Sequence, residues 1–480
     1  MTGSVNLAVR PAHDEAAREY FHHSSGQRVS TDTVIVEALR KQYPELTLTV
    51  APVDDYLASP CDLLAFAAAG HASATPAEDS SDPVYKPLSW RQYLPPARRL
   101  NNDPGLLFST VKFGKYVYKW KDEEFILYVV NGRDGTGYYP SILNNYILSK
   151  AEQITDDLIL AASRFSTELR NEVWVFDQGH WQKSGDLWQS VQKSEWDDVI
   201  LAPDMKKAII QDVDYFFSSR GTYEKLKVPW KRGVIYHGPP GNGKTISIKA
   251  MMHSLYKRKD PIPTLYVRTL SSFAGPEYSI NQIFSKARQE APCYLVFEDL
   301  DSIVTDYVRS YFLNEVDGLK NNDGILMVGS TNHLDRLDPG ISKRPSRFDR
   351  KYFFPNPDLD QRVAYCRFWQ SKLSDNKDIE FPDKLCIAIA RITDKFSFAY
   401  MQEAFVAALL AIAAGGDEPQ KESTSKTDST TTLWAASRER MFLGAAEEDE
   451  LNKLVLWRAI KKQIRILREE LDMNKALTGL

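Results

Sequence analysis

Residues 233–245 read GVIYHGPPGNGKT, and this stretch decides the fold of the chain. An apolar run precedes a glycine-rich turn, and the helical pattern SIKAMMHSLYKR follows at residues 247–258. The turn matches G-x-x-x-x-G-K-[ST], in which glycines let successive backbone N–H groups point inward around a phosphate. The helix that follows adds the positive end of its dipole. We therefore expect a strand, a phosphate-binding loop and a helix, in this order.

Acidic and polar residues follow two further apolar runs. Glu298 and Asp299 end the run YLVFED, and Asp301 comes within the next turn. Mg²⁺ and an attacking water both require carboxylates at the end of a neighbouring strand. The run GILMVGSTN ends in the polar residues 330–332. In open α/β sheets the C-terminal edge of the strands is where ligands bind, so these side chains are expected to share one site.

After residue 196, short apolar runs alternate with helical patterns. The runs are GVIYH, TLYV, CYLVFED and GILMVGSTN. This alternation is typical of an α/β fold with a mostly parallel sheet. Beyond residue 357 the pattern is helical only, and residues 415–432 are low-complexity. A last helical pattern places five apolar residues on one stripe, which could pack on the preceding helices: Leu456, Ile460, Ile464, Leu467 and Leu471.

The part of the chain before residue 196 is richer in β patterns. GLLFSTVKFGKYVYKWKDEEFILYVVNG predicts two or three antiparallel strands, and ILNNYILSKAEQITDDLILAASRFSTEL predicts a helix. NEVWVFDQGHWQKSG predicts a hairpin that turns at residues 177–179. Its tryptophans, Trp174, Trp181 and the later Trp188, are expected in the core rather than against a ligand. Residues 1–103 hold two helical patterns, and residues 71–83 are interpreted as a flexible linker.

These patterns divide the chain into segments. We expect a variable N-terminal region at 1–103, a β-rich α+β module at 104–195, an α/β domain at 196–356, a helical subdomain at 357–414, a low-complexity insertion at 415–445 and a C-terminal helix at 446–480 that packs with the helical subdomain.

Composition argues against several classes of protein. Hydrophobic residues make up 43% and charged residues 26%, which is ordinary globular usage. Lys plus Arg is 60 and Asp plus Glu is 64, so no overall field steers the chain toward nucleic acid or anionic lipid. The 4 cysteines are scattered without C-x-x-C spacing, which disfavours a disulfide framework and a structural zinc site.

No segment of the sequence predicts export or a membrane span. The longest apolar run, AFVAALLAIAAGG at 404–416, falls short of the roughly 20 residues that a membrane-spanning helix needs. The first 20 residues lack an apolar core and carry acids, unlike a secretory signal. We expect a soluble protein of a reducing intracellular compartment, cytoplasmic or nuclear, with a mitochondrial location left open.

The chemistry-bearing segments resemble those of a known family. GPPGNGKT, YLVFEDLD, GSTN and LDPGISKRPSRFDR resemble, in this order, the Walker A, Walker B, sensor 1 and arginine-finger segments of an AAA ATPase. The lead-in at 196–233 resembles the segment that folds over adenine, and SFAYMQEAF resembles the lid motif. Within AAA proteins the chain is most similar to the clade of the mitochondrial translocase of the Rieske iron–sulfur protein, in which a β-rich module, a long helix and a Trp-containing hairpin also precede the ATPase. The resemblance covers roughly residues 104–415.

The resemblance implies a P-loop NTPase sheet with a helical lid, and an enzyme that binds and hydrolyses Mg-ATP. The residues that would contact the nucleotide are Asp198, Val199, Gly238, Pro239, Pro240, Gly241, Asn242, Gly243, Lys244, Thr245 and Ala399. Thr245 and Glu298 would ligate Mg²⁺, Asp299 would act as the base and Asn332 would orient the attacking water. Arg344 and Arg347 match the arginine-finger positions, which act in a neighbouring subunit's site. The resemblance thus implies a homo-oligomeric ring, with a hexamer favoured, that remodels or translocates a protein client.

The sequence departs from the commoner pattern of the family. Most AAA proteins end the Walker B strand with Asp then Glu, whereas here Glu298 precedes Asp299, so hydrolysis could be slow. Phe273-Ala274-Gly275 fits the aromatic loop with which AAA unfoldases grip a client, although an aromatic residue in a turn also packs inward. The transmembrane helix of the translocase clade has no counterpart here.

Two other functions stay open at this stage. One is a nucleotide-gated scaffold with little turnover, motivated by the order of the acid pair. The other is an ATP-driven nucleic-acid motor, for which the sequence offers only short basic clusters at 257–259 and 98–99.

Overall fold

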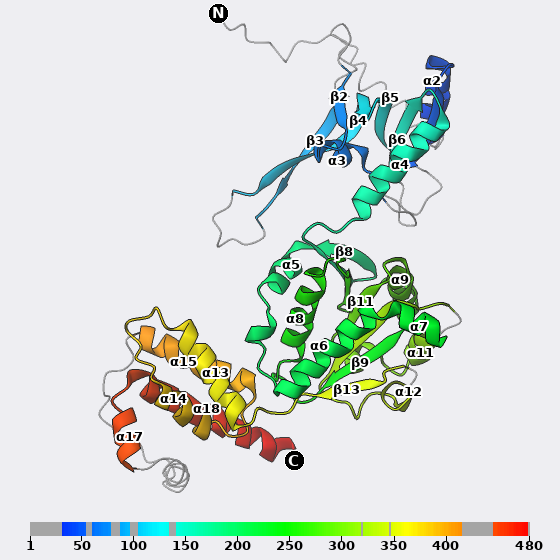
Figure 1. The fold of residues 1–480 in the computed structure, drawn as a ribbon. Helices are drawn as coiled ribbons and strands as arrows, with labels where there is room; N and C mark the ends of the chain where they lie inside the picture. The colour runs from blue at the N-terminus through cyan, green and yellow to red at the C-terminus, as the bar shows by residue number, and fades with distance from the viewer. Residues whose placement is uncertain are drawn as a thin grey trace, which may run out of the picture. The chain divides into compact units, whose positions relative to one another are not determined.

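The computed structural model describes residues 31–53, 60–77, 87–96, 104–133, 141–317, 320–344, 347–414 and 445–478. The chain forms two compact units, Met1–Glu168 and Leu169–Leu480 (Figure 1). The low-complexity segment at 415–432 lies outside the described residues.

The first unit holds one antiparallel sheet with helices packed against it. Its elements are α2 Thr31–Gln42, β1 Thr47–Pro52, α3 Leu63–Ala68, β2 Ser73–Pro76, β3 Leu88–Leu94, β4 Leu106–Trp120, β5 Glu123–Arg133, β6 Ser141–Ser149 and α4 Glu152–Thr167.

Its sheet has the strand order β1-β6-β5-β4-β2, with β3 paired to β4. One face packs on α3 and α4 through side chains such as Tyr118, Leu127 and Leu158. The strands predicted after residue 104 are therefore confirmed. The helix predicted to begin at residue 142 is wrong for residues 142–149, which form β6, because this segment pairs with both β1 and β5. The linker predicted at 71–83 contains β2, which pairs with β4.

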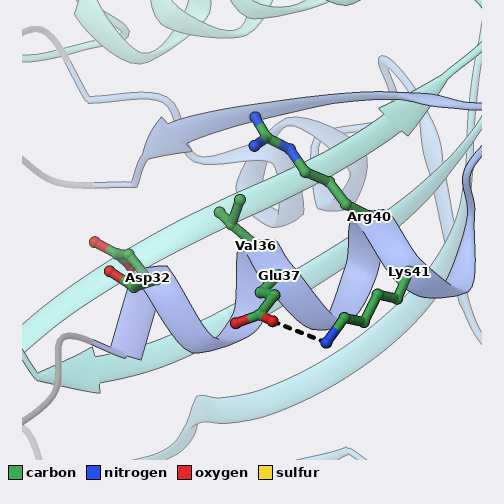
Figure 2. Close-up of a pocket in the computed structure, with 6 residues that line it drawn as sticks. Asp32, Val36, Glu37, Arg40 and Lys41 are labelled. Atoms are coloured by element: carbon green, nitrogen blue, oxygen red, sulfur yellow. Dashed lines mark hydrogen bonds and ion pairs between the residues drawn. The ribbon is translucent and has the colours of Figure 1, made fainter.

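Helix α2 lies on the other face of this sheet. Leu39 is buried against Tyr128 and Tyr146. Asp32 accepts hydrogen bonds from Asn144 and from Tyr146, so two strand side chains fix the first turn of the helix. Figure 2 shows the outer face of α2, where Lys41 Nζ pairs with Glu37 Oε1 at 2.8 Å, one helical turn apart. This face is solvent-exposed, so the pair contributes little to stability.

The second unit contains the predicted α/β domain. Its elements up to residue 353 are β7 Val173–Asp177, β8 His180–Ser184, α5 Gly185–Gln192, the 3₁₀ helix Trp196–Asp198, α6 Pro203–Ser218, α7 Arg220–Leu226, β9 Arg232–His237, α8 Lys244–Tyr256, β10 Thr264–Val267, α9 Pro276–Gln289, β11 Cys293–Phe297, α10 Leu300–Ile303, α11 Arg309–Asp317, β12 Ile325–Thr331, α12 Pro339–Ser342 and β13 Arg350–Phe353.

The sheet of this unit is 7-stranded, in the order β13-β9-β12-β11-β10-β7-β8. Every pair is parallel except β7 with β8, which confirms the predicted parallel sheet. Successive residues of β11 pack on opposite faces of the sheet: Leu295 packs with α9 and α11, whereas Val296 packs with α6 and α8. The result is a three-layer α/β/α arrangement (Figure 1).

The hairpin β7–β8 belongs to this sheet. Phe176 pairs with Trp181 and Asp177 with His180, so the chain turns at residues 178–179 as predicted. The expected module at 104–195 includes this hairpin, but β7 hydrogen-bonds to β10 and the compact units divide after Glu168. Trp174 is buried in the core of the sheet, as expected.

The remaining helices form a cluster with its own hydrophobic core. Its elements are α13 Leu359–Lys372, α14 Asp383–Ile392, α15 Phe398–Ala413, α17 Ala445–Leu451 and α18 Val455–Thr478. The stripe predicted on the last helix contributes Leu456, Ile460 and Ile464 to this core, beside Trp457. The C-terminal helix therefore packs on the helices that precede residue 415. We refer to this set as the C-terminal helical cluster.

Candidate active site

The glycine-rich loop joins β9 to α8 and encloses the Lys244 side chain. Lys244 is only 8% exposed, and its Nζ donates to the carbonyl oxygens of Gly238 at 2.7 Å and Pro239 at 2.9 Å. Burial lowers the pKa of Lys244, while the carboxylates of Asp299 and Asp301 act in the opposite direction. A cationic donor is thus held inside the loop, close to two acids.

The loop also contacts the C-terminal helical cluster. The backbone N–H of Ala399, in the first turn of α15, donates to the carbonyl of Gly241 at 3.1 Å. Gly241 has φ +74, and a Cβ placed there would lie 2.5 Å from the Ala399 Cβ. Only glycine allows both this left-handed backbone and this close approach. The cluster therefore contacts the glycine-rich loop closely at this point.

The acid pair lies at the carboxyl end of β11. Glu298 Oε2 accepts a hydrogen bond from the Tyr266 hydroxyl, and Glu298 Oε1 is buried with no hydrogen-bond partner among the described residues. Asp299 has a left-handed backbone with φ 51, and its N–H donates to Ser330 Oγ at 3.2 Å. Each acid of the pair is thus held by a neighbouring strand.

Asp301 is tied to the end of β12. Its Oδ1 accepts from Thr331 Oγ1 at 2.7 Å. Together with the Ser330 bond to Asp299, this contact ties the loop after β11 to the end of β12, as the sequence predicted for the C-terminal edge of the sheet.

A cavity of about 620 Å³ lies where these elements meet. The predicted site residues that line it are Asp198, Val199, Pro240, Gly241, Gly243, Lys244, Thr245, Glu298, Asp299, Asn332 and Ala399. Gly238, Pro239 and Asn242 are not among its lining residues. They support the loop instead: the first two hold Lys244, and Asn242 Nδ2 donates to Asn356 Oδ1 at 2.8 Å. All predicted nucleotide contacts thus lie in or directly behind one cavity.

One wall of the cavity is aromatic and was not predicted as part of the site. It consists of Tyr365, Phe368 and Trp369 from α13 and Phe398 from α15. Trp369 stacks on Phe405 with centroids 5.1 Å apart, so the wall continues into the core of the helical cluster. Tyr365, Phe368 and Trp369 have i, i+3, i+4 spacing, which indicates that they share one face of α13. Nothing in the sequence shows that this face lines a cavity rather than a core.

The arginine-finger candidates have different surroundings. Arg347 is 8% exposed; its side chain pairs with Asp317 Oδ2 at 2.7 Å and donates to the carbonyl of Gly340 at 2.6 Å. Arg344 has a side chain that is 60% exposed and lies 3.5 Å from Asp317. Neither residue lines the cavity of its own chain. Of these two side chains only that of Arg344 is exposed.

Phe273 lies in the loop between β10 and α9 and is 93% exposed. The same loop, through Ser271 and Ser272, lines a second cavity of about 570 Å³. Glu298 and Asp299 line both this cavity and the first one. The acid pair therefore lies between the two cavities.

The residues present suit a nucleoside triphosphate with Mg²⁺. Carboxylate and hydroxyl oxygens are the donors that Mg²⁺ prefers, and Glu298 Oε1 is a buried oxygen without a hydrogen-bond partner among the described residues. In the described part of the chain no group of three or more His, Cys, Asp or Glu side chains could hold a metal ion.

Comparison with known proteins agrees with this geometry. The family model described as "ATPase family associated with various cellular activities (AAA)" matches residues 234–356. The matched range runs from β9 to just beyond β13 and contains the glycine-rich loop, the acid pair and both arginines. Residues 234–356 therefore match an AAA domain, and the parallel sheet fits a P-loop NTPase fold. The match supports ATPase activity in general.

Proposed function

We propose, from the premise that residues 234–356 form an AAA domain, that this chain is an ATP hydrolase that works as a homo-oligomeric ring on a protein client. The observation that carries the proposal is the cavity of about 620 Å³, which brings together the glycine-rich loop, the acid pair, Asn332 and the first turn of α15. A nucleotide of ordinary size fits a cavity of this volume.

Each residue has a distinct role in the proposed reaction. Lys244 exchanges its bonds to the loop carbonyls for bonds to phosphate oxygens, since it is already inside the loop. The Thr245 hydroxyl and Glu298 hold Mg²⁺, which neutralises phosphate charge when bound. Asn332 orients a water molecule and Asp299 accepts its proton. The water oxygen bonds to the terminal phosphorus while the bond to the bridging oxygen breaks, which gives ADP and inorganic phosphate.

The aromatic wall and α15 are proposed to hold the base and to act as a lid. Tyr365, Phe368 and Trp369 offer π faces on which an adenine can stack, beside Val199 from the segment before α6. The Gly241–Ala399 contact supports a lid, because a shift of the helical cluster moves the loop that holds the phosphates.

The ring is proposed from the arginines. Arg344 is exposed and is assigned as the finger that acts in the neighbouring subunit's site. Arg347 is assigned to hold the finger loop, since its guanidinium is buried and paired with Asp317. A finger neutralises the charge that develops on the transferred phosphoryl group.

A protein client is proposed from the exposed Phe273 and from the resemblance to the translocase clade. An exposed aromatic side chain on a loop next to the acid pair could grip an extended chain. Among the described helices none is both long and apolar enough to cross a membrane, whereas the translocase clade has such a helix.

The other candidate functions receive different support. A scaffold with little turnover is favoured by one feature, the short Asp299 side chain at the base position. The nucleic-acid motor was motivated by the basic cluster at 257–259. In the structure Lys257 pairs with Glu195 and Arg258 pairs with Asp214, so acidic side chains accompany two of its three charges. The second cluster, at 98–99, lies outside the described residues.

Nucleotide binding and turnover can be separated by two variants. We expect Lys244→Ala to abolish ATP binding in a fluorescent-nucleotide titration, because it removes the cation inside the loop. Asp299→Asn should bind ATP with near-wild-type affinity and lose hydrolysis by about 10²-fold or more, because the amide cannot accept the proton. Phosphate release measures the second effect.

The matched control is Asp306→Asn. Its side chain is 96% exposed and pairs with Arg309 on the surface, so both binding and hydrolysis should stay at the wild-type level. Unchanged hydrolysis in Asp299→Asn would remove the assigned base. Unchanged binding in Lys244→Ala would contradict the nucleotide site itself.

A further inference from the structure

The register of the central strands places Tyr266 next to Glu298. Tyr266 of β10 pairs with Val296 of β11, and Glu298 follows Val296 by two residues. Side chains two residues apart on a strand lie on the same face, so Tyr266 and Glu298 are diagonal neighbours. This is the face that α8 covers, since Val296 packs with Ile248. Tyr266 therefore shares the side of the sheet from which α8 and the glycine-rich loop approach.

The two oxygens of Glu298 have unequal surroundings. Oε2 accepts the hydrogen bond from the Tyr266 hydroxyl. Oε1 is buried and has no hydrogen-bond partner among the described residues. A buried carboxylate oxygen without a partner is unfavourable, so this oxygen is suited to accept a contact from a ligand. The tyrosine occupies one oxygen and leaves the other for such a ligand.

Tyr266 is suited to be a fixed donor. Its side chain is half-buried and its hydroxyl donates to Glu298 Oε2, and an ordinary tyrosine hydroxyl carries its proton at neutral pH. Its strand pairs with β11 on one side and β7 on the other, which holds the ring in place. The sequence motifs did not predict that Tyr266 is a partner of Glu298.

We infer that Tyr266 is a positioning residue for Mg²⁺, because it holds Oε2 of Glu298 and leaves Oε1 as the oxygen that binds the cation. This inference rests on the proposed Mg-ATP function and adds a residue to it. Partners that orient a metal-binding side chain typically contribute 10- to 100-fold to metal affinity or activity. The bond does not contact the nucleotide, so its loss should act through the metal.

The test is the Mg²⁺ dependence of nucleotide binding in the full chain. A fluorescent ATP analogue is titrated in EDTA and then at increasing Mg²⁺, for the wild type and for Tyr266→Phe. We expect equal affinities in EDTA. The Mg²⁺ concentration for half-maximal binding should rise about 10-fold in Tyr266→Phe, since only the hydroxyl that orients Glu298 is removed.

The matched control is Tyr352→Phe. Tyr352 donates to Asp212 Oδ2 at 2.5 Å, which is the same kind of bond, but it lies on edge strand β13 and does not line the cavity. This variant should leave both the EDTA affinity and the Mg²⁺ requirement unchanged. Thermal unfolding without nucleotide shows whether either substitution damages the fold.

Two further variants keep the test decisive. In a Glu298→Gln background, adding Tyr266→Phe should not raise the Mg²⁺ requirement further, because the effect acts through that carboxylate. Tyr266→His, which retains an N–H donor, should need less Mg²⁺ than Tyr266→Phe, and it replaces that variant if the phenylalanine chain does not fold. An additive double variant, or histidine and phenylalanine variants with equal defects, would overturn the positioning role.

The failures of the two claims are distinguishable. If wild-type chain does not bind the ATP analogue at any Mg²⁺ concentration, the proposed function fails. If the wild type binds with a clear Mg²⁺ requirement that Tyr266→Phe does not change, the proposed function stands and the inference about Tyr266 is wrong.

Discussion

At the scale of single residues, Lys244 shows how burial prepares a binding group. Its ammonium is inside the loop, and its environment lowers the pKa by desolvation more than Asp299 and Asp301 restore it. A bound triphosphate would place several negative charges beside it and would raise the pKa again. Because the pKa is higher in the bound state, binding takes up protons where free Lys244 is partly neutral, and affinity falls as the pH rises through the free-state pKa.

This linkage gives a prediction for alkaline pH, where ATP itself no longer titrates. Calorimetric titration of ATP in buffers of different ionisation enthalpy should show net proton uptake by the wild type. In Lys244→Arg the uptake should vanish, because arginine stays protonated at every accessible pH. Equal proton uptake by the two proteins would assign the proton to another group.

Single residues also mark the limit of what the sequence could predict. Lys244, Thr245, Glu298 and Asn332 were predicted because each belongs to a short contiguous motif, and all of them line one cavity. The Tyr266 bond to Glu298 was not predicted. It depends on the register of β10 against β11, and register across a crossover helix cannot be derived from one sequence.

At the scale of secondary-structure elements, the contact between the glycine-rich loop and α15 is the most constrained feature. Gly241 and Gly243 both have positive φ, at +74 and +93. They differ in their surroundings: a Cβ on Gly241 would meet Ala399 Cβ at 2.5 Å, whereas one on Gly243 would meet only Ile246 at 3.7 Å. Comparing alanine substitutions at these two glycines therefore separates the effect of backbone strain from that of a steric clash.

We predict that Gly241→Ala is more destabilising than Gly243→Ala. Each substitution costs about 1 kcal/mol or more from the left-handed backbone, and only the first adds the clash with Ala399. Thermal unfolding without nucleotide should show the lower midpoint for Gly241→Ala. Adding Ala399→Gly should raise that midpoint toward the level of Gly243→Ala, and Ser397 Oγ, 3.1 Å from the same Cβ, accounts for the remaining difference. Equal midpoints for the two single variants would contradict the close contact.

Prediction of elements from sequence worked where the pattern was local. Strands β9 to β12 were predicted because each is a short apolar run bounded by turns. Residues 142–149, ILNNYILS, were predicted as helix and form β6, because their pairing with β1 and β5 overrides local preference. The edge strand β13 was missed because Arg350–Phe353 is short and begins with charged residues.

At the scale of the whole molecule, the chain contains two compact units with separate cores. The α/β architecture of the second unit was predictable from its alternation of strands and helices. The placement of the hairpin β7–β8 in its sheet was not, because β7 pairs with β10, and helices α5 to α8 and strand β9 lie between the hairpin and β10 in the sequence. The sequence of a hairpin predicts its turn, but it does not predict which strand pairs with the hairpin in the sheet.

The central claim is that ATP is hydrolysed at contacts between subunits. It is tested most directly by the hydrolysis rate per subunit over a wide range of protein concentration, for the wild type, Arg344→Ala and the neighbouring exposed control Lys343→Ala. We predict that the wild-type and control rates per subunit rise with concentration to a plateau, and that the Arg344→Ala rate is lower by on the order of a thousandfold. A rate per subunit that is independent of concentration and unchanged in Arg344→Ala would contradict catalysis between subunits.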